Sequence, residues 1–253
     1  MNKYEYGLHS KTDERKKIVR KDLLDLFSKR SIPDEHLLVN MGLYTRSSAL
    51  AKILFLDEMY RKILKIPGKL MVFGLWWGQD VIVLENLRAI HEPYNHARKI
   101  VGFDTFSGYP DEEIGENDKK SDVIRGGGYS VSKNYYEYLC DLVQYHENEN
   151  IMHNVKKVDL VKGDVMETLP AYFKAHPETI VAMAYFDMAL YQPTKVALDY
   201  VLQSCVKGSV IVFDELNDAD YPGESIALKE VADLKGIKME RSDILPDRTY
   251  WII

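Results

Sequence analysis

Glycines and carboxylates follow five short apolar segments of this 253-residue chain, and they are the residue types that could do chemistry. Each segment has the composition of a buried strand and ends in a polar turn. In an open parallel sheet, ligands bind beyond the carboxyl ends of the strands, so we expect the five turns to form one site. The turns are Gly74-Leu-Trp-Trp-Gly78, Asp104, Gly163-Asp164, Asp187 and Asp214-Glu215.

The first turn indicates which cofactor the site would take. A dinucleotide fingerprint reads G-x-G-x-x-G, with glycines where the backbone approaches a pyrophosphate. Here Leu75 and Trp76 occupy the region of the middle glycine, which disfavours a pyrophosphate. The turn is compatible with a ligand that has no phosphates, whose amino-acid part and sulfonium lie along it. The alternative is a turn that only packs a strand against a helix.

Two acids at the next strand ends fit a nucleoside. Asp104 can accept hydrogen bonds from both ribose hydroxyls, a contact that NAD and S-adenosylmethionine proteins share. Asp164 is placed to accept from an adenine amino group, or equally to cap a helix that leads into Met166. These residues predict a nucleoside without deciding which one.

The last two strand ends predict a metal site. Asp187, Asp214 and Glu215 offer three hard oxygen ligands on adjacent loops, which suits Mg²⁺ or Ca²⁺ better than zinc. A divalent ion there could hold two neighbouring hydroxyls of an acceptor and lower the pKa of one of them. In the alternative, these acids cap helices or pair with Lys195 and Arg248.

Residues beside the metal site are candidates for work on the acceptor. Asp187 is the candidate for an additional base, and Tyr191 and Gln192 follow it closely enough to contact the acceptor. The seven histidines show no ligand spacing, and none adjoins a strand end.

The elements that must position these residues alternate along the chain. Apolar strands separated by helices are typical of a parallel sheet that is covered on both faces. We therefore expect an α/β fold with a Rossmann-like, mostly parallel seven-stranded sheet, closed at one edge by an antiparallel hairpin. The expected strands are 69–73, 99–104, 158–161, 179–187, 208–214, 238–241 and 249–253, with helices near 80–90 and 194–204.

The N-terminal part predicts a helical extension. Residues 1 to about 36 have one apolar stripe, and residues 45–66 repeat apolar side chains at helical spacing until Pro67-Gly68. We expect residues 1–66 to form an arm packed on the core and 67–253 to form the catalytic domain, the whole being one structural unit. The stripe could instead pack on a second subunit, giving a homodimer or higher homo-oligomer. The acidic insertion 111–128 is expected to form a lid over the acceptor.

Composition excludes several classes of protein. The net charge of −6 argues against a broad nucleic-acid interface, which needs a basic face. Two distant cysteines form neither a zinc motif nor a disulfide framework. No signal peptide and no apolar window of about 20 residues is found, so we expect a cytoplasmic protein without a membrane partner.

The motifs at the strand ends resemble those of the macrocin/mycinamicin sugar O-methyltransferases over roughly residues 40–220. Within that family, the Asp-x-Phe-x-Gly-x-Pro and Asp-x-x-Leu-Tyr elements are the more specific ones. The matching segments are Val72-Phe-Gly-Leu-Trp-Trp-Gly78, Asp104-Thr-Phe-Ser-Gly-Tyr-Pro110, Tyr129-Ser-Val-Ser132, Gly163-Asp-Val-Met-Glu-Thr-Leu-Pro170, Asp187-Met-Ala-Leu-Tyr191 and Val210-Ile-Val-Phe-Asp-Glu215.

The resemblance implies S-adenosylmethionine, Mg²⁺ and methylation of a hydroxyl on a sugar or nucleotide sugar. Carried over, Gly74, Trp76 and Gly78 line the methionine part, Asp104 takes the ribose and Asp164 lies near the adenine. Thr105, Ser132 and Val165, within the same motifs, complete the expected cofactor site. Asp187, Asp214 and Glu215 fall on the metal positions.

Three departures from the family pattern concern the acceptor and the metal geometry. Phe73 stands where a glutamate commonly precedes the first glycine, and Ala189 where a second aspartate is common. Glu215 replaces an aspartate, which keeps the charge and lengthens the side chain.

The prediction is therefore an S-adenosylmethionine-dependent methyltransferase with a small-molecule acceptor. Methyl transfer to a phosphate oxygen, an amine or a phenol is an alternative within the same chemistry. An NAD-dependent sugar oxidoreductase is a second alternative, although the chain has no Tyr-x-x-x-Lys pair to go with a phosphate-binding loop. A binding protein without catalysis is a third.

Overall fold

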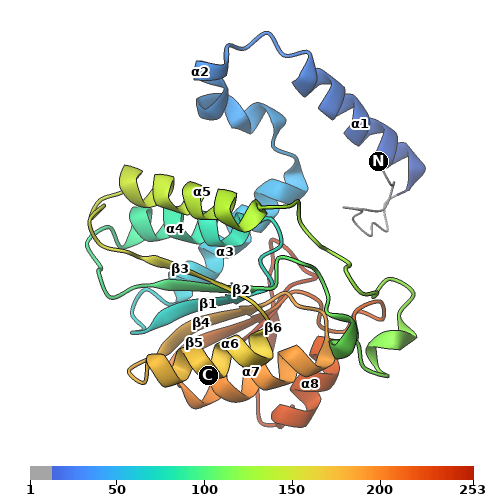
Figure 1. The fold of residues 1–253 in the computed structure, drawn as a ribbon, viewed down its shortest axis with the longest axis vertical. Coiled ribbons are helices and arrows are strands. Elements are labelled where there is room, and N and C mark those ends of the chain that lie inside the picture. The colour runs from blue at the N-terminus through green and yellow to red at the C-terminus, as the bar shows by residue number, and fades with distance from the viewer. Residues whose placement is uncertain (1–12) are drawn as a thin grey trace.

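A seven-stranded sheet forms the centre of the computed structural model, which describes residues 13–253 (Figure 1). The strand order is β3-β2-β1-β4-β5-β7-β6, with β1 to β5 parallel and β7 antiparallel to both of its neighbours. The predicted fold class is confirmed, and each expected strand is present. The strands are β1 Lys69–Phe73, β2 Ile100–Asp104, β3 Val158–Lys162, β4 Val181–Phe186, β5 Cys205–Phe213, β6 Met239–Arg241 and β7 Thr249–Ile252.

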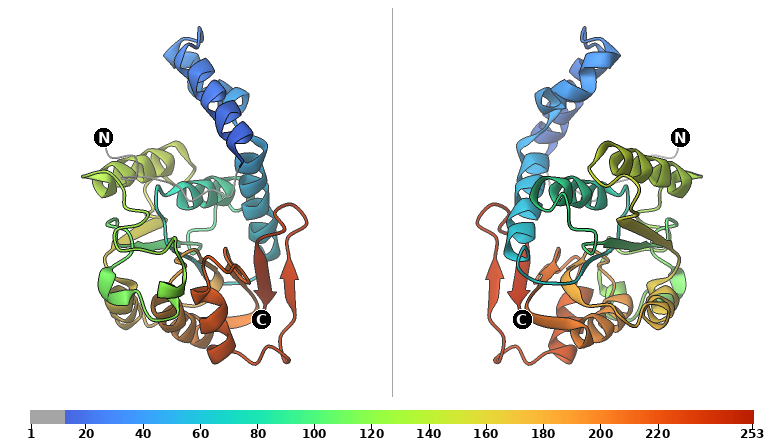
Figure 2. Two further views of the ribbon diagram at one scale, coloured as in Figure 1. Left: turned by 90° about the vertical axis from the view of Figure 1, so that its right-hand side faces the viewer. Right: turned by 90° about the vertical axis from the view of Figure 1, so that its left-hand side faces the viewer.

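Helices cover both faces of the sheet, three on each side (Figures 1 and 2). One face carries α3 (Ser47–Lys62), α4 (Gln79–His91) and α5 (Tyr135–Glu149). The other carries α6 (Val165–Ala175), α7 (Tyr191–Gln203) and α8 (Gly223–Val231). The central strands β1 and β4 are largely apolar because side chains on both of their faces are buried.

Four phenylalanines form a ladder across the sheet just beneath the strand ends. Phe103 of β2, Phe73 of β1, Phe186 of β4 and Phe213 of β5 are register partners, and each is at most 1% exposed. Adjacent ring centroids lie 5.0–5.4 Å apart at interplanar angles of 17–25°. Phe73 therefore takes part in a continuous aromatic layer, and a charged side chain at this position would be buried within it.

The N-terminal arm extends away from the sheet (Figures 1 and 2). It comprises α1 (Glu14–Ser28), α2 (Asp34–Leu37) and the 3-10 helix η1 (Leu38–Tyr44), none of which has a buried residue. Of the expected arm 1–66, α3 packs on the core, the part before it projects, and residues 1–12 lie outside the described residues. No helix within residues 13–253 is long and apolar enough to span a bilayer.

The segment 105–134, between β2 and α5, folds over the strand ends. Its two short 3-10 helices are η2 (Asp111–Glu113) and η3 (Asp118–Lys120). The fully buried carboxylate of Asp118 accepts from the backbone N–H groups of Gly115 and Tyr191, each at 3.1 Å. Ile124 joins a small apolar cluster with residues that follow β4 and β5. These long-range contacts hold the segment against the core.

Candidate active site

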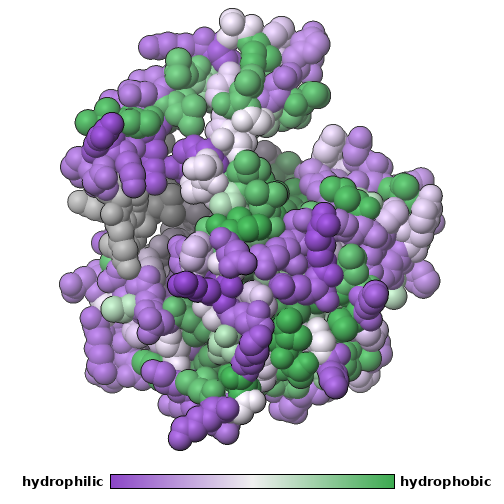
Figure 3. Space-filling view, turned by 180° about the vertical axis from the view of Figure 1, so that it is seen from behind, coloured by the Kyte–Doolittle hydropathy of each residue, from purple (hydrophilic) through white to green (hydrophobic). Residues whose placement is uncertain are grey.

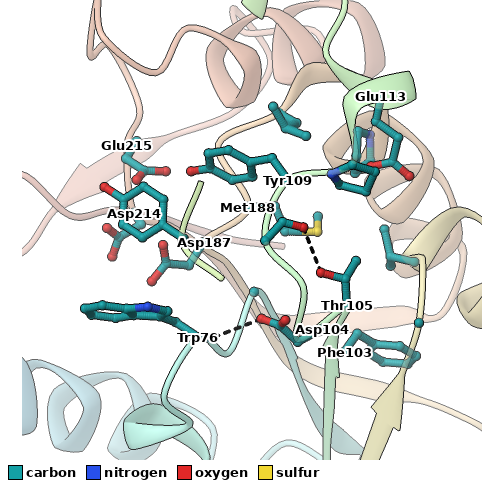
Figure 4. A pocket seen from close by; sticks show the side chains of 18 of the residues that line it. Trp76, Phe103, Asp104, Thr105, Tyr109, Glu113, Asp187, Met188, Asp214 and Glu215 are labelled. Atoms are coloured by element: carbon teal, nitrogen blue, oxygen red, sulfur yellow. Dashed lines mark hydrogen bonds between the residues drawn. The ribbon is translucent and has the colours of Figure 1, made fainter. Parts of the chain in front are cut away.

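A cavity of about 330 Å³ opens at the carboxyl ends of the strands, beneath the segment 105–134 (Figure 4). This is the position that the parallel topology predicts, and the volume suits a small organic ligand. Eight of the residues predicted for the site line the cavity: Gly74, Trp76, Asp104, Thr105, Val165, Asp187, Asp214 and Glu215.

The glycine turn after β1 brings two strand ends into close contact. Gly74 has a φ of 83°, and a Cβ atom on it would lie 1.9 Å from the backbone oxygen of Asp187. Trp76 has a φ of 47°, which is uncommon for a bulky residue and marks a strained turn. Its indole packs edge-on against Tyr129, with ring centroids 5.8 Å apart, and its Nε1 is buried without a hydrogen-bond partner.

Asp104 fixes the conformation of this turn. Its Oδ2 accepts from the N–H groups of Leu75 (2.6 Å) and Trp76 (2.9 Å), and its Oδ1 accepts from Phe106 N–H (2.5 Å). Burial raises the pKa of Asp104, and these three hydrogen bonds oppose the rise. An ionised carboxylate offers about four acceptor positions, so room remains for one hydroxyl donor.

Three carboxylates come together at the ends of β4 and β5. Asp187, Asp214 and Glu215 each place an oxygen within 4.8 Å of the other two. Burial and the charge of Asp214 raise the pKa of Asp187 to about 7. Burial and the neighbouring Glu224 raise the pKa of Glu215 well above its usual range. One oxygen of Glu215, Oε2, is buried and has no hydrogen-bond partner.

Two cations flank this carboxylate cluster. Lys52 of α3 lies 3.0 Å from Asp80 Oδ2 and 3.7 Å from Asp187 Oδ2, measured from Nζ. Arg248, from the turn before β7, forms an ion pair with Asp214 through Nε and donates from Nη1 to its backbone oxygen at 3.1 Å.

The carboxylates outnumber these cations. Buried or partly buried acids at this place are Asp80, Asp187, Asp214, Glu215 and Glu224, against Lys52 and Arg248. The excess of acids, the hard oxygen donors and the unpartnered Glu215 Oε2 all fit a divalent cation.

The sequence also allowed these acids to pair with Lys195 and Arg248 in place of a metal, and the structure shows one of the two pairs. Arg248 pairs with Asp214 as that interpretation predicts. Lys195 does not pair with the cluster, because its Nζ binds Glu230 Oε2 at 2.6 Å on the surface of α7 and α8.

Five predicted residues do not line the cavity. Gly78 caps α4 beside Leu139, and Ser132 lies in the segment that leads to α5. Asp164 caps α6, where its Oδ1 accepts from Met166 N–H at 2.7 Å. The Tyr191 hydroxyl donates to Glu230 (2.7 Å), and Gln192 is exposed. Both residues begin α7, which directs their side chains away from the cavity.

Several residues that line the cavity are not among those predicted from the sequence. Tyr109 and Tyr129 lie inside motifs of the resemblance, so a signal for them was present. Glu113 lies in the acidic insertion 111–128, which is expected to cover the site, although no motif singles it out. Lys52 carries no such signal, because α3 reaches the cavity only through tertiary packing.

Comparison with protein families decides the class of the chain. A model of the macrocin O-methyltransferase (TylF) family matches residues 51–252. The chain belongs to the macrocin O-methyltransferase family. It is therefore an S-adenosylmethionine-dependent methyltransferase, as the motifs predict, and the oxidoreductase and non-catalytic alternatives are set aside. A search among curated proteins gives no significant match.

Solved structures agree with this macrocin O-methyltransferase assignment. The calicheamicin methyltransferase CalS11 is 34% identical with a TM-score of 0.92, over 97% of this chain and 94% of CalS11. An apo structure of CalS11, described as a TDP-rhamnose 3′-O-methyltransferase, is 32% identical with a TM-score of 0.84, over 97% and 96%. The O-methyltransferase NovP shares the fold at 21% identity and a TM-score of 0.62, over 80% and 79%.

Proposed function

We propose that this macrocin O-methyltransferase family member methylates a hydroxyl of a sugar, with a nucleotide-linked deoxysugar as the preferred acceptor. The observation that carries the proposal is the carboxylate cluster of Asp187, Asp214 and Glu215, which opens into the same cavity as the glycine turn. The nucleotide sugar named for CalS11, a relative at 32–34% identity, supports this acceptor class.

The cofactor would lie across the strand ends, from the glycine turn after β1 to the ends of β2 and β3. Its methionine part would follow the turn at Gly74 and Trp76, and its ribose would meet the remaining acceptor position of Asp104. The adenine would then point toward Phe103 and Val165 at the far end of the cavity. This placement directs the methyl group toward the carboxylate cluster.

A divalent cation, proposed as Mg²⁺, would be held by Asp187, Asp214 and Glu215. When bound, such an ion holds neighbouring hydroxyls of an acceptor and lowers the pKa of one of them. Lys52 and Arg248 orient Asp187 and Asp214 through the ion pairs described above. Asp187 is also the proposed acceptor of the hydroxyl proton.

The transfer itself would be a direct in-line displacement. The acceptor oxygen forms its bond to the methyl carbon as the carbon–sulfur bond breaks, which leaves S-adenosylhomocysteine and one proton. The methyl carbon is already activated by the positive sulfur, so the main tasks of the chain are alignment and deprotonation. The segment 105–134 covers the cavity and would keep water from the reacting atoms.

Calorimetry and a methyl-transfer assay test this proposal together. S-adenosylmethionine and S-adenosylhomocysteine should bind, NAD⁺ should not, and TDP-rhamnose should accept a labelled methyl group in the presence of Mg²⁺. Chelation by EDTA and the substitution Asp187→Ala should each lower turnover by at least about 100-fold while the adenosyl ligands still bind. Full activity of Asp187→Ala on a phenol or an amine would instead favour a metal-free acceptor.

We also propose that the projecting arm pairs with a second copy of the chain, and that the protein works in the cytoplasm as a homo-oligomer. The exposed apolar side chains of α1 and η1 support the first part. We further propose that residues 67–253 form the catalytic domain and that residues 1–66 form the arm, which packs on it through α3.

A further inference from the structure

The end of the cavity farthest from the carboxylate cluster forms an apolar slot with one carboxyl group at its edge. Phe103, Pro110 and Val165 provide the apolar lining, and Glu113 of η2 adds the carboxyl group. In Figure 4, Glu113 and Phe103 lie on the opposite side of the view from Asp187 and Glu215. A flat heterocycle would fit such a slot if its polar edge found a partner.

Glu113 has an unusual environment for a carboxyl group. It lies within hydrogen-bonding reach of the Asp164 carboxylate at the start of α6, and its own Oε1 is buried without a partner. Burial and the Asp164 charge raise the pKa of Glu113 to about 8. The charged groups that act on it are Asp164, across the contact with α6, and Glu112 of its own 3-10 helix.

The raised pKa and the contact with Asp164 determine which hydrogen bonds Glu113 can form. A protonated carboxyl group has one O–H donor and one free carbonyl oxygen. In this state Glu113 donates its proton to the Asp164 carboxylate, whose Oδ1 also accepts from Met166 N–H. The carbonyl oxygen of Glu113 is then left as a buried acceptor beside the apolar slot, which is costly unless a ligand supplies a donor.

We propose that Glu113 binds the adenine of the cofactor, accepting a hydrogen bond from its exocyclic amino group. This inference rests on the proposed orientation of the cofactor, in which the ribose lies at Asp104. Asp164 is then a positioning residue that acts through Glu113. Because Glu113 belongs to the segment 105–134, this segment must lie over the cavity for the adenine to be recognised.

Ionisation of Glu113 would break the arrangement. Two neighbouring carboxylates repel each other, so loss of the shared proton would push η2 away from α6. Adenosyl binding should then follow the protonated fraction of Glu113, which falls about tenfold between pH 7 and pH 9 for a pKa near 8. Glutamine is a neutral mimic, because its amide N–H can donate to Asp164 while its oxygen accepts from adenine.

The test is calorimetric binding of S-adenosylhomocysteine to the full-length wild type, Glu113→Gln, Glu113→Ala and the control Glu116→Gln, which changes an exposed acid of the same segment. Between pH 7 and pH 9, the affinity of the wild type and of Glu116→Gln should fall about tenfold more than the affinity of Glu113→Gln. Comparing variants cancels the titration of the ligand's own amino group. Glu113→Ala should bind at least about tenfold more weakly at pH 7, with an unchanged circular dichroism spectrum.

A second pair of ligands tests the contact with the base itself. The wild type should prefer 5′-methylthioadenosine over 5′-methylthioinosine, which lacks the amino group, and Glu113→Ala should lose that preference. Equal preferences in the two proteins, or identical pH profiles for the wild type and Glu113→Gln, would overturn the assignment. Failure of the wild type to bind S-adenosylhomocysteine at any pH would contradict the cofactor site as a whole.

Discussion

Asp187 and its neighbours are acids whose charges the chain neutralises only in part. The pKa of Asp187 is about 7 in the folded protein and near 3.8 without the fold, so the native state binds more protons than the unfolded chain between these values. Its contribution to stability is therefore present below pH 4 and is lost as the pH rises to 7. A bound cation would reverse this loss, since its ligands must be deprotonated.

The prediction at this scale is a pH-dependent stabilisation by Mg²⁺. Addition of 5 mM MgCl₂, roughly the level needed for a moderate-affinity site, should raise the Tm by several degrees at pH 8 and hardly at all at pH 5. Asp187→Asn should remove most of the effect, whereas Asp199→Asn, an exposed acid on α7, should keep it. Thermal scans with EDTA as the reference measure it. A shift that is equal at both pH values would contradict the carboxylate site.

The residues at strand ends could be predicted from the sequence because the topology fixes them. Once the strands are parallel, Asp104, Asp187 and Asp214 must reach the same edge of the sheet. The sequence does not show in which direction a side chain on a helix points. Tyr191 follows the strand end closely in sequence, yet its position on α7 turns its hydroxyl to Glu230. Lys52 is the opposite case: it lies on a helix that precedes the sheet, far from any strand end in sequence, yet it lines the cavity.

The turn between β1 and α4 leaves no room for a side chain at Gly74. A methyl group at Gly74 would collide with the backbone of Asp187, and its φ of 83° disfavours any other residue. We expect Gly74→Ala to lower the free energy of unfolding by at least about 2 kcal/mol and to abolish adenosyl binding. Gly42 in η1 has no atom within 4 Å of a built Cβ, so Gly42→Ala should change stability by less than about 1 kcal/mol. Urea denaturation and calorimetry check both variants.

The phenylalanine ladder is a second element with a clear energetic signature. Phe73→Leu keeps an apolar side chain between Phe103 and Phe186 and should cost about 1–2 kcal/mol of unfolding free energy. Phe73→Glu, the residue common in the family, would bury a charge in the ladder and should cost more than about 4 kcal/mol. Urea unfolding compares them. Equal costs would show that the ladder accommodates a polar group.

Elements were predictable where their apolar pattern was strong. The central strands β1 and β4 are largely apolar and buried, and each strand of the sheet matches its predicted range to within a few residues. Helix α5 was not predicted, and only Leu139 and Val143 of it are buried. The order of the segment 105–134 could not be predicted either. It depends on Asp118 and on the Ser121 hydroxyl, which donates to the backbone oxygen of Asp220, and these contacts join residues about 70 to 100 positions apart.

At the scale of the whole molecule, the arm concentrates exposed apolar side chains, which supports the proposed pairing with a second copy. Of the twenty large apolar side chains that are exposed within residues 13–253, eight lie on residues 18–43 (Figure 3). A helix as short as α1 is marginal on its own, so its stability must come from packing. Residues 14–30 carry seven basic and three acidic side chains, whereas the whole chain has a net charge of −6. In the proposed pairing, the basic arm would therefore complement the acidic body of a second copy.

Light scattering coupled to size-exclusion chromatography tests this pairing. We expect the wild type to elute with a multiple of its 29.2 kDa mass at about 10 μM, because an interface of ordinary size supports association at that concentration. The double substitution Leu38→Glu and Val39→Glu, at side chains 77% and 88% exposed, should give a monomer with a Tm lower by several degrees. Ile90→Glu changes a side chain 69% exposed on α4, outside the arm, and should leave the mass unchanged. A monomeric wild type would contradict the proposed pairing.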